Sequence, residues 1–150
     1  MSDFPSIPDL QCMCASLRRA SRALTQAYDD ALRPTGVRAT QFTILQALSR
    51  AGEISQGQLG QILAIDSTTL TRTLGIMVRE GWIAERPGAD RRERLLHLSK
   101  SGRAQFNRAV PAWERVQDQL LLQLGNKQWR SLLALTAQVT LKTTQQGDVS

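Results

Sequence analysis

The sequence predicts a mainly helical protein that carries one small antiparallel β-ribbon. Apolar side chains recur at helical spacing in long segments near both ends of the chain. Between those segments, WIAER at 82–86 and RLLHL at 94–98 have the composition of short strands, and they enclose a Pro-Gly turn. The chain has 150 residues, which is enough for one domain with a real core. We therefore expect a single folding unit.

A long amphipathic helix is expected from Leu10 to Leu32. The sequence SIPD at 6–9 predicts its start, and RPTG at 33–36 predicts its end. Along one face, mostly apolar residues recur at alternating spacings of four and three. These residues are Leu10, Cys14, Leu17, Ser21, Leu24, Tyr28 and Ala31.

A second helix is expected from about Thr40 to Arg50, and it stops at Gly52. Its inward side chains are Phe42, Ile44, Leu45 and Leu48. A short third helix begins at Ser55, because Ser55 and Gln58 form a capping-box pattern. Its apolar edge consists of Leu59, Ile62 and Leu63.

A fourth helix follows after a tight turn, so the pair is predicted to be a helix-turn-helix. Asp66 can cap it, and Ile65 and Leu70 stand at the two positions of a hydrophobic staple. The core-facing residues are Leu70, Leu74, Met77 and Val78, and Gly81 ends the helix. The opposite face is slender, polar and cationic. It consists of Thr68, Arg72, Gly75 and Arg79, flanked by Thr69 and Thr71.

Positive charge gathers around the predicted ribbon. The chain carries 19 Lys and Arg against 13 Asp and Glu, a net charge of +6. Nine of the basic residues and four of the acidic residues lie between Arg72 and Arg108. Such local charge predicts a polyanionic partner, either nucleic acid or an anionic membrane. A merely solvated turn is the alternative interpretation of residues 86–94.

Two more helices are expected after the ribbon. Ser99 caps a fifth helix, in which Pro111 predicts a kink. Gly125 and Asn126 separate it from a sixth helix, and we expect fraying after Thr143. The apolar stripes of these two helices include Phe106, Val110, Trp113, Val116, Leu120, Leu124, Trp129, Leu132, Leu133, Thr136 and Val139.

The order helix, turn, helix, ribbon predicts a winged helix-turn-helix domain and favours double-stranded DNA as the partner. The fourth helix would enter the major groove, and Arg91 and Arg92 at the ribbon tip would enter the minor groove. Asp90 is expected to orient a neighbouring arginine. An ordinary surface helix is the alternative for the fourth helix. We predict DNA contacts for Ser67, Thr68, Thr69, Thr71, Arg72, Arg79, Arg91 and Arg92.

The run DSTTLTRTLGIMVREGWIAERPGADRRERLLHLSKSG at 66–102 resembles the recognition helix and wing of the MarR family of bacterial transcription factors. The family's L-T-R sequence matches 70–72, and its D-x-R sequence in the wing matches 90–92. Its G-W-[IV] and L-[ST]-x-x-G steps match 81–83 and 98–102. The resemblance extends over nearly the whole chain.

This resemblance implies a winged-helix homodimer that represses transcription by covering a pseudo-palindromic operator. Residues 38–99 would then form the DNA-binding region, and residues 1–34 and 100–145 would form dimerisation helices. The sequence supports the assembly independently, because the terminal helices carry more apolar surface than one small winged helix could cover. The alternative is that these helices fold back onto their own domain.

The two cysteines, Cys12 and Cys14, leave three interpretations open. On a helix they would lie about 200° apart, which disfavours a bridge or a shared metal. Cys14 then packs in the apolar stripe, or one thiol senses an oxidant, or one thiol binds a thiophilic metal. The family's hydroperoxide-sensing branch carries a cysteine and a tyrosine at the spacing of Cys14 and Tyr28, but its second tyrosine corresponds to Ala39 here. A small aromatic ligand is the family's other usual signal.

No enzyme, cofactor or metal site is expected. The single histidine, His97, lies in a predicted strand without a carboxylate pair, a Gly-rich phosphate loop or a ligand cluster. Neither a membrane span nor a secretory signal is predicted, so we expect a cytoplasmic protein with reduced thiols. Two other functions stay open, namely a ligand or thiol sensor with a secondary DNA role and a non-specific architectural DNA-binding protein.

Overall fold

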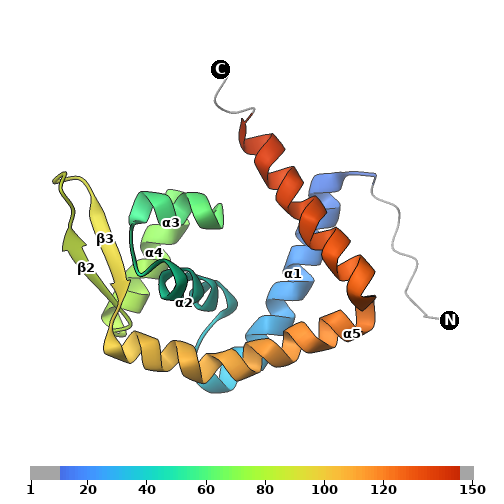
Figure 1. Ribbon diagram of the computed structural model, residues 1–150, viewed down its shortest axis with the longest axis horizontal. Coiled ribbons are helices and arrows are strands. Elements are labelled where there is room, and N and C mark those ends of the chain that lie inside the picture. Colours follow the sequence, from blue (N-terminus) through green and yellow to red (C-terminus); the bar gives the residue numbers. More distant parts are fainter. Residues whose placement is uncertain (1–10, 146–150) are drawn as a thin grey trace. The chain divides into compact units, whose positions relative to one another are not determined.

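The computed structural model describes residues 11–145, and the side chains of residues 11–144 (Figure 1). The predicted helix start at 6–9 and Leu10 lie outside the described residues. The chain divides into two compact units after Pro111. In chain order the elements are α1 (Met13–Leu32), the 3-10 helix η1 (Arg33–Thr35), α2 (Ala39–Ala51), β1 (Glu53–Ser55), α3 (Gln56–Leu63), α4 (Ser67–Arg79), β2 (Ile83–Pro87), β3 (Arg94–Leu98) and α5 (Lys100–Gln145).

The core of the first unit lies between α2, α3, α4 and the sheet. The inward side chains predicted for α2 are all buried, and so are Leu59 of α3 and three of the four predicted for α4. One expectation is wrong, because Ile62 is 62% exposed. Helix α3 ends one residue later at Leu63, and Ala64 turns the chain in a left-handed conformation with φ 51°.

The ends of α3 and α4 have the predicted caps. The Ser55 hydroxyl accepts the backbone N–H of Gln58 at 3.1 Å, and the Gln58 side chain accepts the backbone N–H of Ser55 at 3.1 Å. The Asp66 carboxylate accepts the backbone N–H of Thr69 at 2.8 Å. Gly81, at φ 78°, ends the turn after α4, as glycine can without a steric penalty.

The three strands form an antiparallel sheet in the order β1-β3-β2. The ribbon of β2 and β3 was predicted, whereas β1 was not. Residues 53–55 are too few to show the alternation that predicts a strand. In the sheet, His97 lies opposite both Glu53 and Ala84, so these three residues share a face. Leu96, on the other face, is fully buried.

The start of α5 belongs to the first unit. The Ser99 hydroxyl caps it by accepting the backbone N–H of Gly102 at 2.9 Å. The ring of Phe106 packs on that of Phe42, with centroids 5.4 Å apart. The backbone of α5 leaves helical angles at Gly125, with φ 78° and ψ 157°, and not at Pro111. The predicted fifth and sixth helices are therefore the two segments of α5, and Pro111 lies inside the first segment with helical backbone angles.

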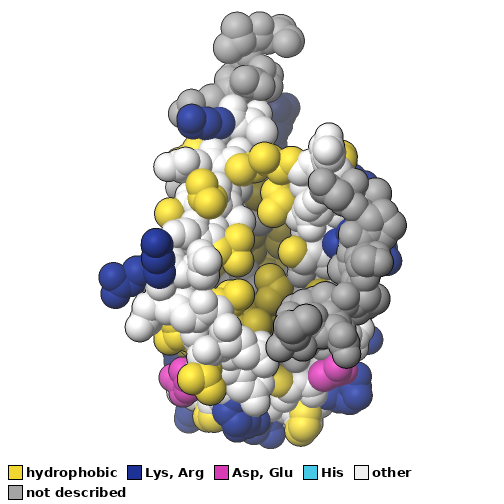
Figure 2. Space-filling view, turned by 90° about the vertical axis from the view of Figure 1, so that its right-hand side faces the viewer, with side chains coloured by type: hydrophobic (Ala, Val, Ile, Leu, Met, Phe, Trp, Pro, Cys, Tyr) yellow, Lys and Arg dark blue, Asp and Glu magenta, His cyan; other side chains and the backbone are white. Residues whose placement is uncertain are grey.

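Many large apolar side chains are exposed on α1 and on the second unit. Figure 2 shows one face of the molecule, on which many hydrophobic side chains reach the surface. Exposed examples are Met13, Leu24, Leu122, Leu132, Leu133, Leu135 and Leu141. Among the described residues, no helix combines the length and the apolarity that crossing a membrane requires.

Candidate nucleic-acid interface

The polar face of α4 is open to solvent. Ser67, Thr68, Thr71, Arg72 and Arg79 are all exposed, as the sequence predicts. Thr69 differs, because it is half-buried and its hydroxyl donates to the Asp66 carboxylate at 2.7 Å. That hydrogen bond and the one from the Thr69 backbone lower the pKa of Asp66. The hydroxyl of Thr69, one of the predicted DNA contacts, is therefore already engaged in the cap of α4.

The wing tip is an ordered turn that presents two arginines. The backbone N–H of Gly88 donates to the Glu93 carbonyl at 2.9 Å, and that of Glu93 donates to the Asp90 carbonyl at 2.9 Å. The Asp90 carboxylate accepts the backbone N–H of Arg92 at 3.1 Å. Asp90 thus contacts the backbone of a neighbouring arginine. Arg91 and Arg92 are exposed.

The arginines of the basic segment serve different purposes. Arg86 donates from Nε to the Glu53 carboxylate at 2.8 Å and makes a second, shorter contact through Nη2. Arg94 lies 3.6 Å from the carboxylate of Glu85. Within residues 11–144, no ion pair involves Arg72, Arg79, Arg91 or Arg92. Within residues 53–99, the cations without an ion pair are therefore those of the α4 face and the wing tip.

Glu53 of β1 contacts Arg86 of β2 and His97 of β3 on one face of the sheet, and this residue was not identified from the sequence. The hydrogen bond from Arg86 holds the pKa of Glu53 below its usual value, and the same bond raises the pKa of Arg86. His97 Nδ1 lies 3.6 Å from Glu53 Oε2 and is buried without a hydrogen-bond partner. Glu53 and Arg86 are 33 residues apart, so no local pattern could pair them.

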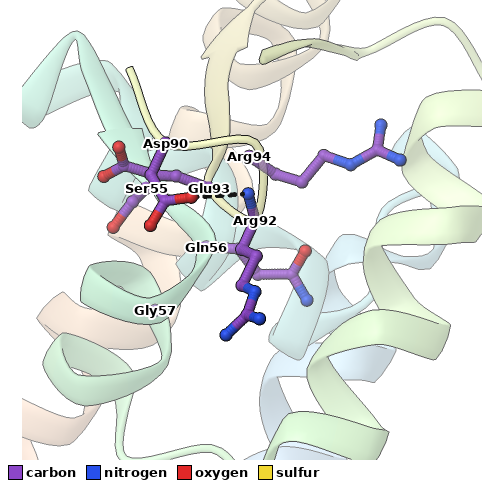
Figure 3. A pocket seen from close by; sticks show the side chains of 7 residues that line it. All are labelled: Ser55, Gln56, Gly57, Asp90, Arg92, Glu93 and Arg94. Carbon is purple, nitrogen blue, oxygen red and sulfur yellow. Dashed lines mark hydrogen bonds between the residues drawn. The ribbon is translucent and has the colours of Figure 1, made fainter. Parts of the chain in front are cut away.

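A second residue that was not identified from the sequence is Gln56, the first residue of α3, which contacts α4 and lines a cavity beside the wing. Its Nε2 donates to the Thr71 hydroxyl at 3.0 Å. Gln56 also lines an open cavity of about 450 Å³ between the start of α3 and the wing tip (Figure 3). In that view the side chain of Arg92 extends alongside Gln56, whereas that of Arg94 points away. Gln56 thus contacts the exposed face of α4 and lines the same cavity as Arg92.

The cysteines are both exposed in the single chain. Cys12 is the N-cap of α1 in an extended conformation, with φ −115° and ψ 112°, so the helical angle between the thiols does not apply. Cys14 lies in the first turn of α1 and is not packed within the chain. Tyr28 is half-buried, and burial raises its pKa. The described residues contain no cluster of His, Cys, Asp and Glu suited to a metal.

Comparison with known proteins points to one family. A model described as "MarR family" matches residues 35–93. The transcriptional regulator PecS of Dickeya dadantii is 29% identical over 140 residues, which cover 88% of this chain and 84% of PecS. The multiple antibiotic resistance protein MarR of Salmonella typhimurium is 36% identical over 74 residues, which cover 49% of this chain and 51% of MarR.

Solved structures agree with this match. The M. tuberculosis transcriptional regulator MosR in complex with DNA has a TM-score of 0.81 and 36% identity, covering 89% of this chain and 96% of MosR. An E. coli MarR mutant complexed with operator DNA has a TM-score of 0.76 and 23% identity, covering 85% of this chain and 92% of that chain. The second similarity supports the fold alone.

Proposed function

Because the chain belongs to the MarR family of DNA-binding transcriptional regulators, which are not enzymes, we propose that it is a homodimeric repressor of a pseudo-palindromic operator. One observation carries the proposal. Between Glu53 and Ser99, the cations left without an ion pair in the described residues are confined to the α4 face and the wing tip. A regulator of chromosomal operators acts in the cytoplasm, where we place this protein.

In the proposed complex, α4 lies in the major groove. Thr68, Thr71 and Arg72 face base edges, because short hydroxyl side chains and Gly75 allow close approach and arginine pairs with guanine. Ser67 and Arg79, nearer the two ends of α4, contact phosphates. Thr69 is the weakest candidate of the predicted set, since its hydroxyl is bound to Asp66.

The wing is proposed to enter the adjacent minor groove. Arg91 and Arg92 are unpaired cations at its tip, and the negative potential of a narrow minor groove attracts such side chains. Asp90 stabilises the turn that presents them. The paired Arg86 and Arg94 are proposed to hold the sheet rather than to contact DNA.

Dimerisation is proposed to bury the exposed apolar surfaces of α1 and of the second unit. Leu122 is 86% exposed and Leu141 is 61% exposed in the single chain. Exposed leucines at such density mark a protein interface. We assign residues 1–34 and 100–145 to the dimer and residues 38–99 to DNA binding.

The direct test of this function is binding to the DNA upstream of the gene, compared with a random duplex of equal length. We expect a preference of at least about 1,000-fold at physiological salt, as for specific regulators. Equal affinity for both duplexes would instead favour a non-specific architectural protein. Loss of transcription from the upstream promoter when the protein is added would establish repression, and a gain would establish activation.

Release of the operator by thiol oxidation is a second proposal, favoured by the exposure of Cys12, which lies outside the apolar stripe of α1. A hydroperoxide would oxidise one thiolate to a sulfenic acid and would itself be reduced to an alcohol or water. We expect peroxide to weaken DNA binding by the wild type but not by Cys14→Ser or Cys12→Ser, whichever carries the reactive thiol. Equal loss in the wild type and both variants would remove thiol sensing and leave a small aromatic ligand as the proposed signal.

A further inference from the structure

Gln56 donates a hydrogen bond to the hydroxyl of Thr71, and this bond affects which groups that hydroxyl can bind. Gln56 is the first residue of α3, and its Nε2 reaches across the turn of the helix-turn-helix to the hydroxyl of Thr71 at 3.0 Å. Thr71 lies on the exposed face of α4, directly before Arg72. The two residues are 15 positions apart, so this contact exists only because α3 and α4 pack together.

The direction of the hydrogen bond matters. A threonine hydroxyl has one proton to donate and two lone pairs that accept. Two other helical threonines donate their proton to the backbone of their own helix, Thr43 to the Ala39 carbonyl at 3.0 Å and Thr73 to the Thr69 carbonyl at 2.9 Å. Thr71 instead accepts from Gln56, and the described part of the chain offers its own proton no acceptor. The Thr71 proton is therefore left for an acceptor outside the chain.

We propose that Gln56 is a positioning residue for DNA recognition, holding Thr71 as a hydrogen-bond donor to an acceptor on a base edge in the major groove. The acceptors of that class are guanine O6 and N7, adenine N7 and thymine O4. Gln56 does not touch the base itself in this arrangement. The inference rests on the proposed function, because it requires α4 to lie in the major groove.

The hydrogen bond between Gln56 and Thr71 contributes little to folding stability. Its removal can therefore change DNA recognition without unfolding the protein. The hydrogen bond is exposed, so water competes for both partners in the free protein. It gains importance when DNA excludes that water. The side chain of Gln56 can therefore be changed without removing a buried contact, and alanine is tolerated at the first position of a helix.

The test uses the full-length protein and a library of operator duplexes in which each base pair is varied singly. Gln56→Ala and Thr71→Val should each reduce discrimination at the same operator position by about three- to tenfold, the effect of one hydrogen bond. The double variant should lose no more than either single variant. Gln56→Glu should lose the same positional discrimination as Gln56→Ala, because a carboxylate only accepts and would take the Thr71 proton. Its negative charge should also weaken binding to every duplex, so uniform loss is judged on Gln56→Ala and Thr71→Val alone.

Gln61→Ala is the matched control, since Gln61 is exposed on the same helix and has no bond to Thr71. It should keep the wild-type profile, and all variants should keep the wild-type melting temperature. Additive losses in the double variant, or a uniform loss across all sequences, would overturn the inference. If the wild type itself fails to distinguish its operator from random duplex, the proposed function fails instead.

Discussion

At the scale of single residues, the basic segment divides into two groups with different chemistry. Arg86 and Arg94 face carboxylates from other strands, so they stabilise the sheet more than they attract an anion. Arg91 and Arg92 are exposed and form no ion pair within residues 11–144, and Asp90 acts on their turn through the backbone. Net charge alone could locate this segment, but only the ion pairs separate its two groups.

Changing Arg92 to alanine should weaken operator binding by about 1–3 kcal/mol and reduce its salt dependence, because one cation leaves the DNA surface. Titrations at several salt concentrations would measure both effects. Arg130→Ala, which removes an exposed arginine from the second unit, serves as the control of equal charge. Wild-type affinity in Arg92→Ala would show that the wing does not contact DNA.

Glu53 should make the folding stability of the protein depend on pH in the acidic range. Its pKa is lowered in the folded state by Arg86, so the pair contributes stability above the ordinary pKa of glutamate and loses it as the pH falls through the lowered value. The melting temperature of the wild type should therefore fall more steeply than that of Glu53→Gln between about pH 5 and about pH 3. Glu114→Gln on α5 is the control. Parallel curves for the wild type and Glu53→Gln would refute the role of this pair.

At the scale of secondary structure, the helix ends were predictable and the sheet was predictable only in part. Helix caps and the glycines that end helices depend on local sequence, so the roles of Ser55, Asp66 and Gly81 could be predicted from the sequence. Strand β1 and the partner of Arg86 depend on pairing between distant segments. The Gln56 contact was missed for the same reason, because it forms only when two helices pack.

Gly102 lets α5 approach the backbone of Trp82, which lies between α4 and β2, and alanine there should destabilise the protein. A Cβ at this position would lie 1.9 Å from the Trp82 carbonyl oxygen, so the backbone would have to move. We expect a loss of about 1–3 kcal/mol or more in the free energy of unfolding, measured by denaturant titration.

Gly75→Ala is the matched comparison for this change. An added Cβ there meets nothing within 4 Å, and the residue lies inside α4. Its free energy of unfolding should rise by about 0.5–1 kcal/mol, because alanine favours a helix. If Gly102→Ala were as stable as Gly75→Ala, the close approach of α5 to Trp82 would be wrong.

At the scale of the whole molecule, the sequence predicted the apolar stripes at both chain ends and the break at Gly125. It did not predict which stripe residues the single chain leaves exposed. Cys14 and Leu24 belong to the predicted stripe of α1, yet both are exposed. Periodicity identifies an apolar face, but it does not identify what covers that face.

The most direct test of the central claim is the number of chains bound to one operator. Sedimentation of the full-length protein, alone and with an excess of upstream duplex, measures that number. We predict two chains in the free protein and two chains on each duplex, because two recognition helices and two wings bind together. A single chain, either free or on the duplex, would contradict the account.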